Sequence, residues 1–185
     1  MDNGAVNYKK FLNGDDNGIV EIVKDYKDGL ILYLNRYVED IFIAEELTED
    51  TFFKLMVKKP KFFPKYSFKT WLYTIGRNVA LDYIRKKKKI ADVSLENNEI
   101  QLNEEETLLQ SYLVEERKQI VHKALRNLKS EYKEVLQLSY FEEFSNAETA
   151  RIMKKTKRQV EMLVYRAKQS LKSELLKEGF VYEEL

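Results

Sequence analysis

Apolar side chains recur at spacings of three and four along most of this chain, which places them on one face of an α-helix. Six glycines and two prolines in 185 residues are too few for the many sharp turns of sandwiches and doubly wound sheets. The expected fold class is therefore all-α. The spacing predicts helices over residues 18–37, 44–58, 68–88, 131–140, 146–153 and 157–177, with a further amphipathic segment through Val121, Leu125 and Leu128.

The predicted helix 68–88 has two different faces. Before it, residues 59–67 interleave two prolines and three aromatic residues with lysines, so we predict a basic, aromatic loop there. Ser67 is placed to cap the helix that follows. At 100° per residue the stripe expected to be buried is Phe68, Leu72, Ile75, Val79 and Tyr83, and the neighbouring face carries Trp71, Thr74, Asn78 and Arg85.

Two helices near the C-terminus begin with recognisable capping signals. Ser145 and Glu148 have the spacing of a capping box, in which the hydroxyl accepts a bond from the third helical N–H and the acidic side chain reaches back. Thr156 and Gln159 repeat this spacing at the start of the longer helix. Two short-spaced helices of this kind, the second long and basic, predict a helix-turn-helix.

The turn between these helices contains no glycine, so Lys154 or Lys155 is expected to adopt the left-handed conformation. The helix 157–177 should pack one face on the preceding helix and present the other to a major groove. Its inward stripe is Val160, Val164, Ala167, Leu171 and Leu175, and its outward face carries Arg158, Met162, Tyr165, Arg166 and Gln169.

Composition excludes several classes of protein. There is no cysteine and His122 is the single histidine, which rules out a disulfide scaffold, a thiolate zinc site and a multi-histidine metal site. The sequence has no Gly-rich phosphate loop and no HExxH motif. No apolar run reaches the ~18 residues of a membrane span, and the N-terminus lacks a signal peptide core. We therefore expect a cytoplasmic protein that is not an enzyme and holds no metal or cofactor.

The net charge of +1 conceals blocks of opposite sign. Residues 1–53 carry a net charge of −7, residues 54–89 of +11, residues 90–116 of −8 and residues 150–177 of +7. Two basic blocks separated by an acidic one suggest two modules that meet a polyanion. We predict two small helical domains, residues 8–89 and 114–178, joined by a flexible acidic linker over residues 90–113.

Three segments together resemble a known family. They are AEELTEDTFFKLM at residues 44–56, FKTWLYTIGRNVALDYIRKKKK at residues 68–89, and the helix-turn-helix segment at residues 132–172. Their order and spacing resemble those of bacterial sigma factors of the extracytoplasmic-function group within the sigma-70 family. The resemblance implies a factor that binds core RNA polymerase and directs it to promoters, where it melts the −10 element with its first domain and reads the −35 element with its second.

The resemblance, combined with side-chain chemistry, assigns residues to each role. Melting DNA needs aromatic rings that replace base stacking and cations that hold the separated strand. The −10 and melting residues are Phe62, Phe63, Lys65, Tyr66, Lys69, Trp71, Thr74, Arg77, Asn78, Arg85, Lys86 and Lys87, with Tyr73 as a further aromatic candidate. The −35 residues are Lys157, Arg158, Gln159, Met162, Tyr165, Arg166 and Gln169. The polymerase-binding residues are Glu45, Glu46, Leu47, Glu49, Asp50, Phe52 and Phe53.

The sequence leaves two other functions to compare with this one. One is a stand-alone helix-turn-helix regulator with a sensing or dimerising N-terminal module, which would have no use for strand-melting aromatic residues. The other is an enzyme acting on nucleic acid, which would need a paired-carboxylate or metal cluster that the sequence does not offer. The expected partners are the clamp and flap regions of core polymerase and promoter DNA. Many members of the group are held inactive by an anti-sigma factor, and the sequence leaves such a partner open.

Overall fold

The computed structural model describes residues 2–91 and 120–180. Within these ranges the chain forms helices and no strand, as the periodicity predicts. The proposed linker beyond Ala91 and the predicted start of the second domain at Val114 lie outside the described residues. The elements are α1 (Asn3–Leu12), α2 (Asn17–Val38), α3 (Ile41–Lys58), α4 (Phe68–Ala91), a helical segment over residues 120–126, α6 (Ser130–Leu136), the π-helical turn η1 (Gln137–Phe141), α7 (Asn146–Met153) and α8 (Lys157–Lys177).

Helices α1 to α4 form the first domain. Helix α2 packs against α1, α3 and α4, and its residues Ile22, Leu30 and Leu34 are fully buried among them. The predicted inner stripe of α4 faces this core, with Phe68 and Leu72 fully buried. Asp40 caps α3 by accepting bonds from two backbone amides. Each apolar face is covered by a neighbouring helix, so the four helices share one core.

Helix α1 lies outside the range that apolar periodicity predicted, and it docks tightly on α2. A Cβ built on Gly18 of α2 would lie 2.2 Å from the carbonyl oxygen of Asn7 in α1, so only glycine permits this approach. The side chain of Tyr8 is buried, and its hydroxyl donates to the carbonyl of Pro60 at 2.8 Å. Helix α1 therefore supports the start of the basic, aromatic loop.

The second domain contains the predicted helix-turn-helix. Both capping boxes form, Ser145 with Glu148 at the start of α7 and Thr156 with Gln159 at the start of α8. The turn between α7 and α8 places Lys154 in the left-handed region with φ of 56°, so the prediction for this turn is confirmed. The predicted helix 131–140 begins one residue earlier, and its last turns widen into η1.

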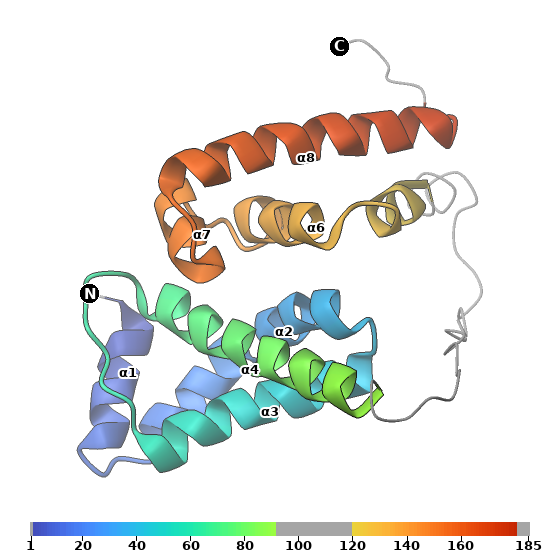
Figure 1. Ribbon diagram of the computed structural model, residues 1–185. Coiled ribbons are helices and arrows are strands. Elements are labelled where there is room, and N and C mark those ends of the chain that lie inside the picture. The colour runs from blue at the N-terminus through green and yellow to red at the C-terminus, as the bar shows by residue number, and fades with distance from the viewer. Residues whose placement is uncertain (1, 92–119, 181–185) are drawn as a thin grey trace, which may run out of the picture.

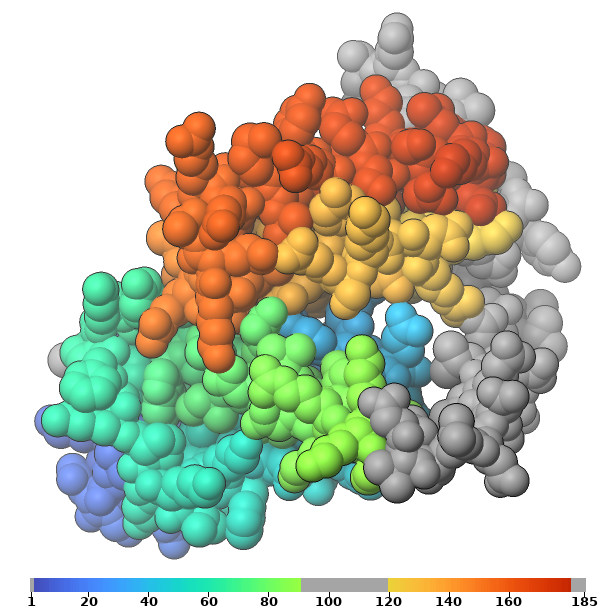
Figure 2. Space-filling model, in the orientation of Figure 1, coloured from blue at the N-terminus to red at the C-terminus, as the bar shows by residue number. Residues whose placement is uncertain are grey.

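The two domains lie against each other (Figure 1). Helix α7 packs on α4 and α6 packs on α2, whereas α8 lies on the far side of the second domain. In the space-filling view the side chains of α7 and α4 meet along the boundary between the domains (Figure 2). The recognition helix is thus turned away from the first domain, while α6 and α7 cover part of α4.

Candidate nucleic-acid and polymerase interfaces

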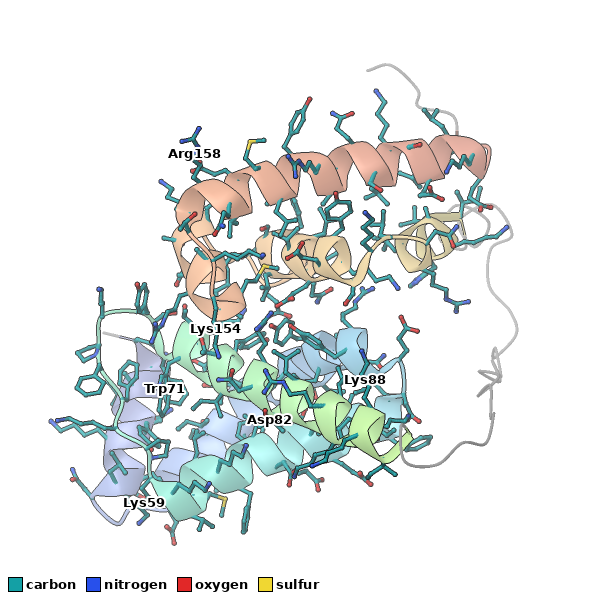
Figure 3. The ribbon with its side chains drawn as sticks, in the orientation of Figure 1. Lys59, Trp71, Asp82, Lys88, Lys154 and Arg158 are labelled. Atoms are coloured by element: carbon teal, nitrogen blue, oxygen red, sulfur yellow. The ribbon has the colours of Figure 1, made fainter. Side chains whose placement is uncertain are left out.

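The aromatic residues around the start of α4 divide into a packed cluster and free rings. The ring of Trp71 lies 5.2 to 5.4 Å from the rings of Tyr8, Phe62 and Phe68. Trp71 and Phe62 are half-buried in this cluster, so neither ring is fully open to a stacking base. Trp71 lies beside α1 in Figure 3. The cluster therefore fixes the point at which the loop over residues 59–67 joins the start of α4.

Two residues of the loop project beyond this cluster. Phe63 is 63% exposed, and the ammonium group of Lys61 lies 5.0 Å from its ring centre. Lys65 is exposed and lies over the half-buried ring of Tyr66. Because an exposed ring beside cations can stack on an unpaired base, Phe63 is the freest platform among the predicted aromatic residues.

One aromatic candidate is wrong. Tyr73 is 1% exposed, and its hydroxyl donates to a carboxylate oxygen of Glu142 at 2.6 Å. Burial raises the pKa of Tyr73 well above its usual range, and the bond to Glu142 raises it further. A buried, hydrogen-bonded phenol cannot serve as an open stacking surface in this arrangement.

The cations predicted to hold the melted strand fall into two groups along α4. In its first half, Lys69 forms an ion pair with Glu142 at 2.9 Å and Arg77 forms one with Glu134 at 2.7 Å. At its end the side chains of Arg85, Lys86, Lys87, Lys88 and Lys89 are exposed, and Arg85 pairs with neighbouring Asp82.

The remaining residues of the α4 face lie where the helical spacing predicted. Thr74 and Asn78 are half-exposed on α4 beside Arg77. The hydroxyl of Thr74 donates to the carbonyl of Thr70 one turn earlier, so it is occupied by its own helix. Burial acts to lower the pKa of Arg77, but the hydrogen bond and charge of Glu134 outweigh it and the pKa is raised, so the guanidinium stays charged.

Helix α8 presents its predicted outward face to solvent. Val160 and Ala167 of the inner stripe are buried, together with Leu163, which the stripe did not include. Arg158 points away from the first domain (Figure 3). The exposed residues on this face are Lys157, Arg158, Gln159, Met162, Tyr165, Arg166 and Gln169, which are all seven of the predicted −35 residues.

A hollow of about 380 Å³ lies at the start of α8. Its lining includes Arg158, Gln159, Met162 and Arg166, with Glu131 of α6 on the opposite side. Lys155 closes one edge through an ion pair with Glu131 at 2.6 Å. The polar side chains of the helix start therefore surround a concave surface, as expected where a helix-turn-helix meets base edges.

Helix α3 carries the residues predicted to bind polymerase, and it presents some and buries others. Leu47 and Phe52 lie in the core of the first domain, where they support the helix from beneath and cannot touch a partner directly. The helix surface is both acidic and apolar, because Phe42, Met56 and Val57 are also exposed. Its exposed predicted residues are Glu45, Glu46, Glu49, Asp50 and Phe53.

Two kinds of functional residue are not marked by the sequence pattern. Tyr8 lies in a helix that the periodicity did not identify, and it packs on Trp71 while holding Pro60. Glu134 contacts Arg77 and Glu142 contacts Lys69, each more than fifty residues away, and no local pattern marks these two acidic residues. A buried position for an acidic residue inside an amphipathic segment, as at Glu134, is a signal that could have been noticed.

Among residues 2–91 and 120–180 no three histidine or acidic side chains gather closely enough to bind a metal ion. No helix within the same ranges is long and apolar enough to cross a membrane. The described surfaces offer exposed aromatic rings, cations and hydrogen-bond donors.

Comparison with known proteins finds two family regions in this chain. The profile for Sigma-70 region 2 matches residues 22–90, and that for Sigma-70, region 4 matches residues 118–171. The ECF RNA polymerase sigma factor SigW of Bacillus subtilis is 26% identical over 175 residues, which cover 90% of this chain and 94% of SigW. SigM of the same organism is 27% identical over 161 residues, covering 84% of this chain and 93% of SigM.

Solved structures show the same fold. The sigma factor RpoE of Bartonella quintana, in complex with the anti-sigma factor NepR, superposes with a TM-score of 0.65 at 25% identity, covering 85% of this chain and 95% of RpoE. CnrH, in complex with the cytosolic domain of CnrY, superposes with a TM-score of 0.67 at 19% identity, covering 95% and 98%. With region 2 in its first domain and region 4 in its second, the chain belongs to the extracytoplasmic-function group of sigma-70 factors, which start transcription with RNA polymerase at specific promoters.

Proposed function

We propose that this sigma factor holds a promoter at two separate places, using the loop and α4 for the melted −10 strand and α8 for the −35 duplex. The observation that carries this division is the placement of two basic surfaces on two domains, one with exposed aromatic rings and one with a helix-turn-helix face. A stand-alone regulator is not favoured, because region 2 accompanies region 4 in the chain.

On the first domain, Phe63 stacks on a base that has left the duplex, which is worth about 1–3 kcal/mol per base. Lys65 and the exposed cations that follow Arg85 hold the backbone of the separated strand. Trp71 and Phe62 support this surface through their cluster with Tyr8. Asn78 supplies a short amide for a base edge or a phosphate.

On the second domain, Lys157 and Arg166 contact phosphates and set the position of α8 in the major groove. Arg158, Gln159, Met162 and Gln169 read base edges, with arginine favouring guanine and glutamine favouring adenine. Because α8 belongs to a separate domain, it can adjust its position on the duplex without disturbing the strand that the first domain holds.

The exposed acidic and apolar surface of α3 is the proposed contact with the polymerase clamp. Its carboxylates Glu45, Glu49 and Asp50 suit a basic partner surface, while Phe53 supplies an apolar anchor.

The flap region of the polymerase is the proposed partner of the second domain. The proposed location of this protein is the cytoplasm, because bacterial polymerase and the chromosome are both there. RpoE was solved with the anti-sigma factor NepR, so an anti-sigma factor is a candidate partner here as well.

A run-off transcription assay with core polymerase on fragmented genomic DNA, followed by sequencing of the transcript starts, tests this function. We expect transcripts that depend on the protein and share two upstream sequence elements. Phe63→Ala should leave polymerase binding intact and reduce strand opening, measured by permanganate reactivity of unpaired thymines. Val20→Ala, which also truncates an exposed apolar side chain of the first domain but lies outside the proposed interfaces, is the control and should leave opening unchanged. Normal opening by Phe63→Ala would remove the loop from the melting surface.

A further inference from the structure

Helix α1 precedes the part of the chain that matches Sigma-70 region 2, because that match begins at residue 22. It packs on α2, and it also reaches α4 and the loop over residues 59–67, which runs beside it from the end of α3 to the start of α4 (Figure 1). Tyr8 of α1 meets the beginning of that loop, and Asp2 meets its end. The two contacts therefore bracket the segment that is proposed to hold the melted strand.

The carboxylate of Asp2 caps two helices at once. One of its oxygens accepts from the Gly4 amide at 3.0 Å and so caps α1 itself. The other oxygen accepts from the amide of Phe68, the first residue of α4. An N-cap hydroxyl such as that of Ser67 reaches a later amide, here that of Thr70 at 3.2 Å. Asp2 thus supplies the partner for the first amide of α4, where a negative charge also suits the helix dipole.

Tyr8 and Phe11 hold the opposite end of the loop. The Tyr8 hydroxyl donates to the carbonyl of Pro60 at 2.8 Å, and the ring of Phe11 lies 5.0 Å from the ammonium group of Lys59. Lys59 ends α3 in the left-handed conformation with φ of 42°, which favours glycine over other residues. Contacts with α1 therefore stabilise a backbone turn that the loop's own sequence disfavours.

The residues between these anchors depend on them for their position. Phe62 is held by its ring contacts with the cluster, and beyond it Phe63, Pro64 and Lys65 are exposed. Within this exposed stretch the Lys65 amide donates to the carbonyl of Phe63 at 2.8 Å, which closes a turn of only three residues. Pro64 has no amide hydrogen to offer. The place of the Phe63 ring is therefore set by where the loop is anchored at each end.

We propose that α1 is a positioning element that holds this loop in place for the melted −10 strand, with Asp2 and Tyr8 as its two anchors. The inference rests on the proposed function of the loop. Neither anchor touches the DNA, because each acts by placing the exposed ring of Phe63. A helix outside the matched family region thus determines how readily this sigma factor opens a promoter.

The advantage of α1 comes from order that is established before the strand binds. A loop that is free to move must be ordered when a base stacks on Phe63, and the lost conformational freedom reduces the affinity. A loop that is held at both ends has already lost that freedom during folding. The stacked ring can then contribute its full interaction to strand opening.

Tyr8→Phe tests the anchor at the beginning of the loop. It removes the hydroxyl that holds the Pro60 carbonyl and keeps the ring in its cluster. Tyr26→Phe is the matched control, because the ring of Tyr26 also packs on Phe68, at 5.7 Å, whereas its hydroxyl lies beside Gly4 of α1.

Asp2→Ala tests the anchor at the end of the loop. It removes the carboxylate that accepts from the Phe68 amide. Its control is Asp16→Ala at the start of α2, where the carboxylate makes no capping bond to its own helix. All four variants should compete for core polymerase as well as the unsubstituted protein does, because none of them alters α3.

Opening is measured with holoenzyme on a promoter that run-off transcription has located, as the permanganate reactivity of unpaired thymines over a series of holoenzyme concentrations. We expect Tyr8→Phe and Asp2→Ala each to raise the concentration for half-maximal opening about fivefold, which is the usual effect of losing one hydrogen bond. The two controls should stay within about twofold of the unsubstituted protein.

A double-mutant cycle with Phe63→Ala distinguishes positioning from a purely structural role. If Tyr8 acts by placing Phe63, Tyr8→Phe should change opening by less than about twofold once residue 63 is alanine. A further loss of about fivefold in that background would mean that Tyr8 contributes only to stability, and it would overturn the inference.

The same measurements separate this inference from the proposed function. Normal opening by both anchor variants, together with a defect in Phe63→Ala, would overturn the role of α1 and leave the proposed function in place. Normal opening by Phe63→Ala would overturn both, since α1 acts through that ring. Run-off transcription that does not depend on the protein would also overturn both.

Discussion

Replacing Gly18 with alanine tests whether α1 docks on α2 as described. In a solvent-exposed helix this change stabilises by up to about 1 kcal/mol, because glycine gives up more backbone freedom on folding. Here the new Cβ would lie 2.2 Å from the Asn7 carbonyl oxygen and 2.7 Å from the Phe11 amide nitrogen. Both atoms belong to the backbone of α1, so the whole helix must move by about 1 Å to restore ordinary contact.

The expected result is a net loss. Overpacking of this kind costs about 1–3 kcal/mol, which exceeds the gain in helix propensity. At about 4–8 °C per kcal/mol for a domain of this size, the melting temperature of the first domain should fall by several degrees or more. Movement of α1 also withdraws Tyr8 from Trp71, whose ring centre lies 5.2 Å away. Trp71 is the single tryptophan, so its emission should change in the folded variant.

Urea denaturation followed by Trp71 fluorescence measures this loss. Gly76→Ala is the control, because its new Cβ would meet the ends of the Leu30 and Leu34 side chains at 3.0 and 3.5 Å, and flexible ends can shift. We expect Gly76→Ala to stay within about 1 kcal/mol of the unsubstituted protein. A Gly18→Ala variant that is as stable as the parent would refute the close approach of α1 and α2.

Three further predictions concern other parts of the molecule. Burial raises the pKa of Tyr8 and Tyr26 to about 12, so the stability that their neutral phenols contribute is complete below pH 10 and is lost as pH rises through about 12. Urea denaturation at a series of pH values should show this decline, and the tyrosinate absorbance of these two residues at 295 nm should rise only near pH 12. Thr156→Ala should cost about 1 kcal/mol in thermal unfolding of the second domain, and Thr156→Ser should restore it; equal stability of all three proteins would contradict the capping role. Arg166→Ala should lower the slope of log affinity for −35 duplex DNA against log salt by about one, whereas Lys9→Ala should leave it unchanged; an unaltered slope for both would exclude Arg166 from the phosphate contacts.

Local signals were sufficient for much of the second domain. The Ser145 and Thr156 hydroxyls and their partners three residues later predicted where α7 and α8 begin, because a cap is formed within one turn. A short turn without glycine predicted a left-handed residue at Lys154 or Lys155, and Lys154 adopts that conformation. The outward face of α8 followed from helical geometry alone, since its angular position depends only on the spacing of its apolar residues.

Prediction failed where a side chain's surroundings come from distant segments. Periodicity identified α3 as a helix, but it could not tell that Leu47 and Phe52 would be buried beneath α2 and α4 rather than offered to a partner. It grouped Tyr73 with the stacking residues, whereas Glu142, 69 residues away, holds its hydroxyl in a buried bond. The π-helical turn η1 also has no local signature in this segment.

By itself the sequence determined an all-helical chain with two basic modules, the boundaries of its capped helices and the residues that face outward on α8. These properties depend on interactions within a few residues or on charge summed over a segment. Only the tertiary structure decided that α1 supports the aromatic loop and that Glu134 and Glu142 sit on Arg77 and Lys69. Those contacts join segments 50 or more residues apart, and the shape of both packed surfaces selects them.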